Sequence, residues 1–306
     1  MYYLAEALPG IRGRRLPLSR DQLMLIMAAI NQIFLGIDIF LAHKISGTIV
    51  PREWIPIIFG PIAGGLLLVA GILALRRRET ATIIASVIFV ASILVGLLGA
   101  YFHLIRAILP TAPVGSRVTV DLLVWAPPIL GPLTFSLVGL LGLSAAWREA
   151  PPDSGTLDLY RNRRIHLPYS KTRAYLFLVS FGSLATLISS VLDHARVNFE
   201  NPWLWLPTII GVFATVAAFT LASLNKPTKG DITVYVVAMC SMILIGIVGS
   251  VLHIQDNLTA GSAIVPERFI RGAPFLAPML FANMGTLGLI ALMDPDEPVL
   301  ETGKST

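Results

Sequence analysis

Charged side chains are scarce in this chain. Only 13% of its 306 residues are Asp, Glu, Lys or Arg, against about 25% in a typical soluble protein. Apolar residues make up 55%, and the mean hydropathy is +0.75. Several apolar runs approach or exceed the roughly 18–20 residues that a helix needs to cross a bilayer. The composition therefore excludes an ordinary soluble protein and predicts an all-α polytopic membrane protein.

Cysteine is nearly absent as well. The single residue, Cys240, lies within an apolar run, so an internal disulfide is excluded. The chain also lacks a Gly-rich phosphate loop, a nucleotide-binding fingerprint and the H-x-x-x-H, C-x-x-C and H-E-x-x-H metal motifs. The net charge of +5 is explained by basic loops on one side of a membrane. We therefore expect membrane lipids as partners and no nucleic acid.

Eight transmembrane helices are predicted from the apolar runs, because only helices satisfy every backbone amide of such a run in lipid. The first run follows a basic stretch and is too long for a signal-peptide core, so we interpret it as a retained span. Prolines in the fourth and eighth spans should kink those helices; they are Pro128, Pro132, Pro274 and Pro278. The expected spans are 22–43, 55–75, 81–107, 119–146, 174–194, 203–223, 232–254 and 270–293.

Lysine and arginine are distributed unevenly between the two sides of this arrangement. With the N-terminus inside, 16 of the 23 basic residues fall on the inner side. This asymmetry places both termini in the cytoplasm, and in a bacterium it predicts a multi-pass protein of the inner membrane. The expected organisation is an N-terminal segment (1–21), a four-helix unit (22–147), a basic linker (148–173), a second four-helix unit (174–293) and a polar tail (294–306).

Internal repeats divide the chain into these two units. The pattern I-L-x-G-x-x-G-x-x-x-H occurs at 93–103 and again at 243–253, an offset of 150. W-x-P-x-I-x-G begins at Trp54 and at Trp205, and P-x-L-x-P-x-x-F begins at Pro128 and at Pro274. Because each unit has an even number of spans, both copies share one topology. We therefore expect two parallel four-helix repeats related by a pseudo-twofold axis along the membrane normal.

Four of the five histidines fall at the outward ends of predicted spans. They form two equivalent pairs, one in each unit, and imidazole is the commonest metal ligand in proteins and an axial ligand of haem iron. Carboxylates nearby could orient or supplement the imidazoles. The expected metal ligands are His43 and His103 in the first unit, His194 and His253 in the second, and Asp38 and Asp193 beside them.

Glycines accompany two of these histidines. Gly99 precedes His103, and Gly249 precedes His253, by one helical turn on the same helix face. Small residues there would provide clearance for the ring of a haem b, so both glycines are expected to contribute to cofactor binding. The same spacing also lets two membrane helices pack closely with no cofactor. Haem b and copper are therefore the two candidate cofactors.

The layout of four-helix units with paired histidines about 60 residues apart resembles that of the haem A synthases and other multi-haem membrane proteins. The glutamate-x-x-histidine-arginine stretch of that synthase family is missing, since Leu104 and Ile105 follow His103. The resemblance implies haem as a candidate ligand and assigns no activity.

The functional hypothesis is an integral membrane subunit with a histidine-based metal or haem b site near the outer, periplasmic face. It would serve electron transfer within a larger complex, with other membrane or periplasmic subunits, a quinone or a small redox protein as partners. A copper-dependent subunit, a small-solute or proton-coupled transporter, and a structural or assembly subunit without cofactor are the alternatives.

Overall fold

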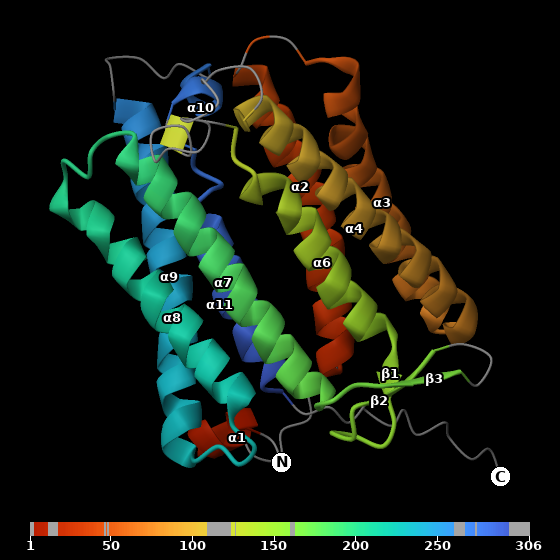
Figure 1. The fold of residues 1–306 in the computed structure, drawn as a ribbon. Helices are drawn as coiled ribbons and strands as arrows, with labels where there is room; N and C mark the ends of the chain where they lie inside the picture. Colours follow the sequence, from red (N-terminus) through yellow and green to blue (C-terminus); the bar gives the residue numbers. More distant parts are fainter. Residues whose placement is uncertain are drawn as a thin grey trace.

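Long helices run side by side through the computed structural model, and a small sheet lies at one end of them (Figure 1). The structure describes residues 3–11, 18–45, 47, 49–108, 124–125, 127–159, 163–259, 267–272 and 274–293. Within these ranges, six helices are long and apolar enough to cross a membrane. They are α2 (Arg20–Ile45), α3 (Trp54–Ala74), α4 (Arg78–Ile108), α7 (Lys171–Ala195), α8 (Trp205–Ser223) and α9 (Lys229–Thr259).

The fourth and eighth helices are shorter than the sequence suggests. α6 (Leu130–Ala146) has 17 residues and α11 (Met279–Ala291) has 13, which is about 26 Å and about 20 Å at 1.5 Å per residue. The predicted spans 119–146 and 270–293 are therefore too long as continuous helices, although 119–123 lies outside the described residues. A hydrocarbon core of about 30 Å exceeds both lengths.

Prolines set the beginnings of these two short helices. Pro128 precedes α6 and Pro132 lies in its first turn, whereas Pro274 precedes α11 and Pro278 is its N-cap. The expectation that they kink a longer helix is wrong. Proline lacks an N–H group, and a helix can do without that donor only in its first turn.

The helices form two groups that meet along the middle of the molecule (Figure 1). In the first half, α2 packs against α3 and α6, and α4 packs against α3 and α6. In the second half, α7 packs against α8 and α11, and α9 packs against α8 and α11. The halves touch where α6 meets α7 and where α11 meets α2.

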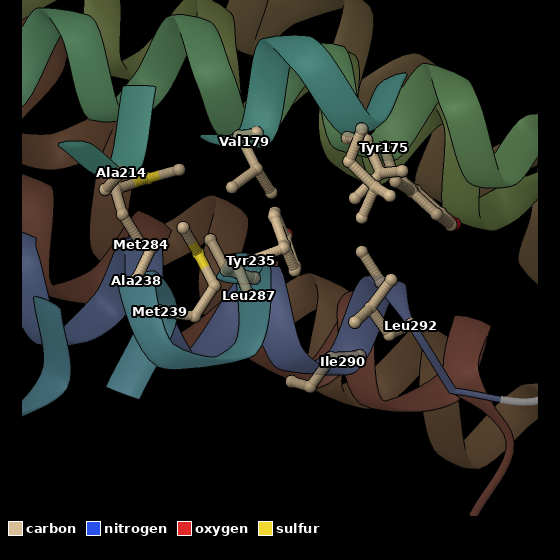
Figure 2. Close-up of a cluster of buried hydrophobic side chains, with 14 of the residues drawn as sticks. Tyr175, Val179, Ala214, Tyr235, Ala238, Met239, Met284, Leu287, Ile290 and Leu292 are labelled. Carbon is tan, nitrogen blue, oxygen red and sulfur yellow. The ribbon is translucent and has the colours of Figure 1, made fainter. Parts of the chain in front are cut away.

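Each half has its own apolar core. One cluster, which includes Phe89 and Phe135, fills the first half. A larger cluster fills the second half, where Tyr235 and Met239 of α9 face Leu287 of α11 (Figure 2). A few residues of the first half, such as Met24, join this second cluster. Their burial contributes to the attachment of the two halves.

Glycines bring α4 against α6, and α9 against α11. A Cβ on Gly96 would lie 2.6 Å from the backbone nitrogen of Ser136. A Cβ on Gly246 would lie 2.8 Å from the carbonyl oxygen of Pro278. Real Cβ atoms do not approach a neighbouring backbone so closely, so only glycine permits these two crossings.

The predicted linker contains a small β-sheet, whereas an all-α chain was expected. β1 (Arg148–Glu149), β2 (Thr156–Asp158) and β3 (Arg164–His166) form an antiparallel sheet in that order. The Glu149 carboxylate holds the linker onto α7, because it accepts the backbone N–H groups of Lys171 at 2.9 Å, Gly155 at 2.8 Å and Asp153 at 3.1 Å. α7 begins at Lys171, which lies within the predicted linker (148–173).

The first residues of α2 and α7 meet in a buried polar cluster. Lys171 donates its Nζ–H to the Asp21 carboxylate and to the carbonyl oxygen of Trp147. Arg20 donates to the Thr172 hydroxyl at 2.6 Å. The Arg20 and Lys171 side chains are 1% and 0% exposed, so their charges require these partners.

Short helices complete the described chain. α1 (Tyr3–Ala7) is tied to the end of α11, because Leu4 N–H donates to the Leu292 carbonyl at 3.2 Å. The predicted tail, 294–306, and residues 12–17 of the N-terminal segment lie outside the described residues. The remaining short elements are η1 (Pro9–Ile11), η2 (Pro51–Glu53), η3 (Pro202–Leu204) and α10 (Glu267–Arg271).

Candidate metal site at the histidine end of the bundle

Four predicted ligand histidines lie toward the ends of helices at the side of the bundle opposite the sheet (Figure 1). His43 lies in the last turn of α2, and His194 in the last turn of α7. His103 and His253 lie shortly before the ends of α4 and α9. The helix ends that were expected to share one side of the bundle therefore do so.

The two imidazoles of the first half are close together. The ring centroids of His43 and His103 are 6.0 Å apart, with the rings in an edge arrangement. Two nitrogens that ligate one ion at about 2.0–2.1 Å each lie no more than about 4 Å apart. The ring separation is compatible with a shared ion after small side-chain rotations.

Backbone carbonyls orient both of these rings. Nδ1 of His43 lies 2.9 Å from the Ile39 carbonyl oxygen, and Nδ1 of His103 lies 2.9 Å from the Pro128 carbonyl oxygen. Because a carbonyl oxygen only accepts, Nδ1 carries the proton in each ring. In a neutral imidazole this makes Nε2 the nitrogen with the lone pair. Metal-binding histidines are commonly held in the same way.

Glu53 is a member of this site that the sequence did not reveal. Its Oε1 lies 3.9 Å from Nε2 of His43, and the two side chains are only 11% and 15% exposed. Its Oε2 accepts the backbone N–H of Val50 at 3.0 Å. The only sequence signal is its place immediately before the repeated W-x-P-x-I-x-G motif.

The second half has a related arrangement. Nδ1 of His253 lies 3.1 Å from the Pro274 carbonyl oxygen, which matches the contact between His103 and Pro128. His194 and His253 are close enough to interact electrostatically. The ring contact of His194 is with Phe199, at 5.9 Å between centroids, and its Nδ1 is buried with no hydrogen-bond partner.

The two predicted aspartates belong to different halves and interact electrostatically with each other. Asp193 forms an ion pair with Arg196 at 3.4 Å and also interacts electrostatically with His194 and His253. Asp38 is exposed on α2 and interacts with Asp193 across the halves. The structure thus brings Asp193 to the imidazoles of its own half, and it brings Asp38 to the other aspartate.

The two predicted clearance glycines face prolines. A Cβ on Gly99 would lie 2.7 Å from Cβ of Pro132, and one on Gly249 would lie 2.9 Å from Cβ of Pro278. The space above each glycine is therefore filled by a side chain of the neighbouring helix. Close helix packing accounts for these glycines, and the residues present do not provide a surface for a porphyrin there.

Among the described residues, no group of three or more His, Cys, Asp or Glu side chains could hold a metal ion. The remaining histidine, His166, lies on β3 at the sheet end of the bundle, where its ring contacts the hydroxyl of Thr156 at 3.2 Å. Comparison of the chain with protein-family models, curated proteins and solved structures finds no match. The functional argument therefore depends on the residues themselves.

Proposed function

We propose that the protein is an integral membrane subunit that binds a metal ion through paired imidazoles near its outer face. One observation carries the proposal: His43 and His103, from two different helices, have ring centroids 6.0 Å apart. Copper is the ion that we favour over haem b, because imidazole and carboxylate together suit Cu²⁺ and proline side chains fill the space at Gly99 and Gly249.

We further propose that the chain consists of two parallel four-helix repeats, with α6 and α11 as the fourth span of each. Equivalent contacts support this: His103 binds the Pro128 carbonyl as His253 binds the Pro274 carbonyl. The contacts between the first residues of α2 and α7 are reciprocal, which is the hallmark of a twofold relationship. Together these contacts favour a pseudo-twofold axis between the halves, along the membrane normal.

The proposed setting is a bacterial inner membrane with both termini in the cytoplasm, as the distribution of basic residues predicts. The histidine end then faces the periplasm. A redox role for the ion requires an electron donor or acceptor, which a membrane or periplasmic subunit, a small redox protein or a quinone would provide. We therefore place the protein within a larger membrane complex.

Metal analysis and a visible absorption spectrum of the purified protein test the proposal. We expect stoichiometric copper without a Soret band. His103→Ala should remove the ion, whereas His166→Ala, at the other end of the bundle, should leave it in place. A Soret band would move the assignment to haem b. Equal loss of metal from the two variants would contradict the assignment to the histidine end.

A structural role without cofactor is the second candidate, and it rests on a specific observation. His103 and His253 each donate to the carbonyl of a proline that precedes a short helix. In this alternative the histidines stabilise helix breaks. Purified protein with neither metal nor Soret band would favour it.

A further inference from the structure

The exposed cations at the sheet end of the bundle differ between the halves. Three consecutive arginines connect α3 to α4 in the first half, and Arg76 and Arg77 are exposed there. The equivalent connection of the second half, from α8 to the first residue of α9, has two exposed lysines, Lys226 and Lys229. Lysine and arginine serve equally to orient a chain in a membrane, so orientation does not account for the arginines.

The sheet adds more arginines at the same end of the first half. Trp147, which follows α6, donates its indole N–H to the Ser86 hydroxyl of α4 at 3.0 Å. This bond holds the beginning of the sheet against α4. Figure 1 shows the sheet beside the ends of α4 and α6, whereas α1 packs against α9 in the second half. The exposed arginines of the sheet and its turn are Arg148, Arg163 and Arg164.

Helix capping accounts for an arginine in the second half but not for those that follow α3. Arg173 donates from Nε to the Ala222 carbonyl at 2.6 Å, near the end of α8. At the end of α3, the backbone N–H groups of Arg76 and Arg77 donate to the Leu73 carbonyl at 3.0 and 2.8 Å. Backbone donors therefore cap α3, and this role does not explain its arginine side chains.

Carboxylates offset only part of the charge. Arg164 pairs with Asp158 at 2.8 Å. Glu79 is exposed in the first turn of α4, and Glu149 is buried and accepts backbone N–H groups. The further exposed arginines define what we call the arginine surface: Arg76, Arg77, Arg148 and Arg163.

Apolar side chains adjoin this surface. Ile72 and Leu75, in the last turn of α3 and at its C-cap, are 70% and 76% exposed. A nucleic acid or an acidic soluble protein would match the charge and leave these side chains in water. A phospholipid matches both features, because it has an anionic head and apolar tails. Guanidinium groups also bind phosphate oxygens in pairs, which an ammonium group does not do.

We propose that the arginine surface binds the phosphate headgroups of anionic phospholipids, with their acyl chains along Ile72 and Leu75. The lipid comes from the leaflet at the sheet end, and the lysines of the second half do not select it in this way. This binding fixes the first half, and the sheet attached to it, at the level of the headgroups. It does not depend on a metal ion at the histidine end.

Titration of the purified full-length protein in a neutral detergent with phosphatidylglycerol tests the proposal, with bound lipid counted by native mass spectrometry. We expect phosphatidylglycerol to bind at least about tenfold more tightly than phosphatidylcholine. The double variant Arg76→Gln, Arg77→Gln should weaken this binding at least about tenfold. The double variant Lys226→Gln, Lys229→Gln removes the same charge from the second half and should bind as the unaltered protein does.

A variant in the sheet provides an independent check. Arg163 holds the sheet through its backbone carbonyl, which accepts the Leu159 N–H at 2.9 Å, so Arg163→Gln should fold and also bind phosphatidylglycerol more weakly. Excess glycerol 3-phosphate should not displace the lipid, and displacement would identify a free phosphate ester as the ligand. That result would overturn the proposal. So would equal losses in the two double variants, or equal affinity for phosphatidylglycerol and phosphatidylcholine.

Discussion

The ammonium group of Lys171, the first residue of α7, donates a hydrogen bond to Asp21, the second residue of α2. The contact has a counterpart in the opposite direction. Arg20, the first residue of α2, donates to Thr172, the second residue of α7. Tyr175 lies beneath both cations, and its hydroxyl donates to Asp21 at 2.9 Å. The two halves are thus joined by a reciprocal polar contact at the sheet end of the bundle.

Lys171→Met should destabilise the protein markedly, because it leaves the Asp21 carboxylate without its ammonium partner. Breaking a buried ion pair costs about 3–5 kcal/mol. We expect Tm in detergent, measured by circular dichroism, to fall by about 5–15 °C.

The double variant Asp21→Asn, Lys171→Met should recover part of this loss, because the carboxylate that lost its ammonium partner is then neutral. The recovery should be incomplete, since the buried Arg20 also loses its ion pair with Asp21 at 3.6 Å. Lys226 is exposed in the loop between α8 and α9, so Lys226→Met provides the surface control, with a change within about 0.5 kcal/mol. Similar Tm values for Lys171→Met and Lys226→Met would contradict the importance of the buried pair.

Gly246→Ala should weaken the packing of α9 against α11. The added Cβ would lie 2.8 Å from the Pro278 carbonyl oxygen, and the helices must separate to admit it. Such overpacking costs about 1–3 kcal/mol. The matched change, Gly65→Ala on α3, meets nothing within 4 Å and should leave Tm unchanged or raise it through better helix propensity. A fall in Tm of equal size in both variants would show that helix crossing is not the cause.

Cysteine labelling in whole cells tests the proposed orientation. Cys240 is exposed on α9, so it is first replaced by Ala. Glu200→Cys then lies at the histidine end, and Lys226→Cys lies at the sheet end; both positions are exposed. An impermeant maleimide should label Glu200→Cys in intact cells and Lys226→Cys only after permeabilisation. The reverse pattern would place the histidine end in the cytoplasm.

The six long helices could be predicted from sequence because their apolar runs are continuous and uninterrupted by loop signals. The lengths of α6 and α11 could not. Apolar residues continue before Pro128, and hydropathy alone does not register that the backbone leaves the helix there. Before Pro274 the predicted span began at residue 270, whereas α11 begins at Met279. The sheet was also missed. Its strands are two or three residues long, and Glu149 anchors them through bonds to backbone that no periodicity records.

The proximity of His43 and His103 was anticipated, because both were placed at one depth in the same unit. Glu53 could not be identified, since its approach to His43 depends on the turn of η2 back toward α2. The sequence also did not reveal that prolines pack against Gly99 and Gly249. The spacing of the glycines indicates close approach of another group, which could be a cofactor or a helix. Only the structure identifies that group as a proline side chain at the start of the neighbouring helix.

The contact between the beginnings of α2 and α7 has a consequence for biosynthesis. Arg20 and Asp21 leave the ribosome long before Lys171 and Thr172 exist, and at about 5–20 residues per second the interval is on the order of 10–30 s. During that time two charged side chains lie at the membrane boundary without the partners that later enclose them. Water or lipid headgroups must solvate these charges until α7 has been synthesised. The polar contacts of the first half are therefore complete only after the second half has begun to insert.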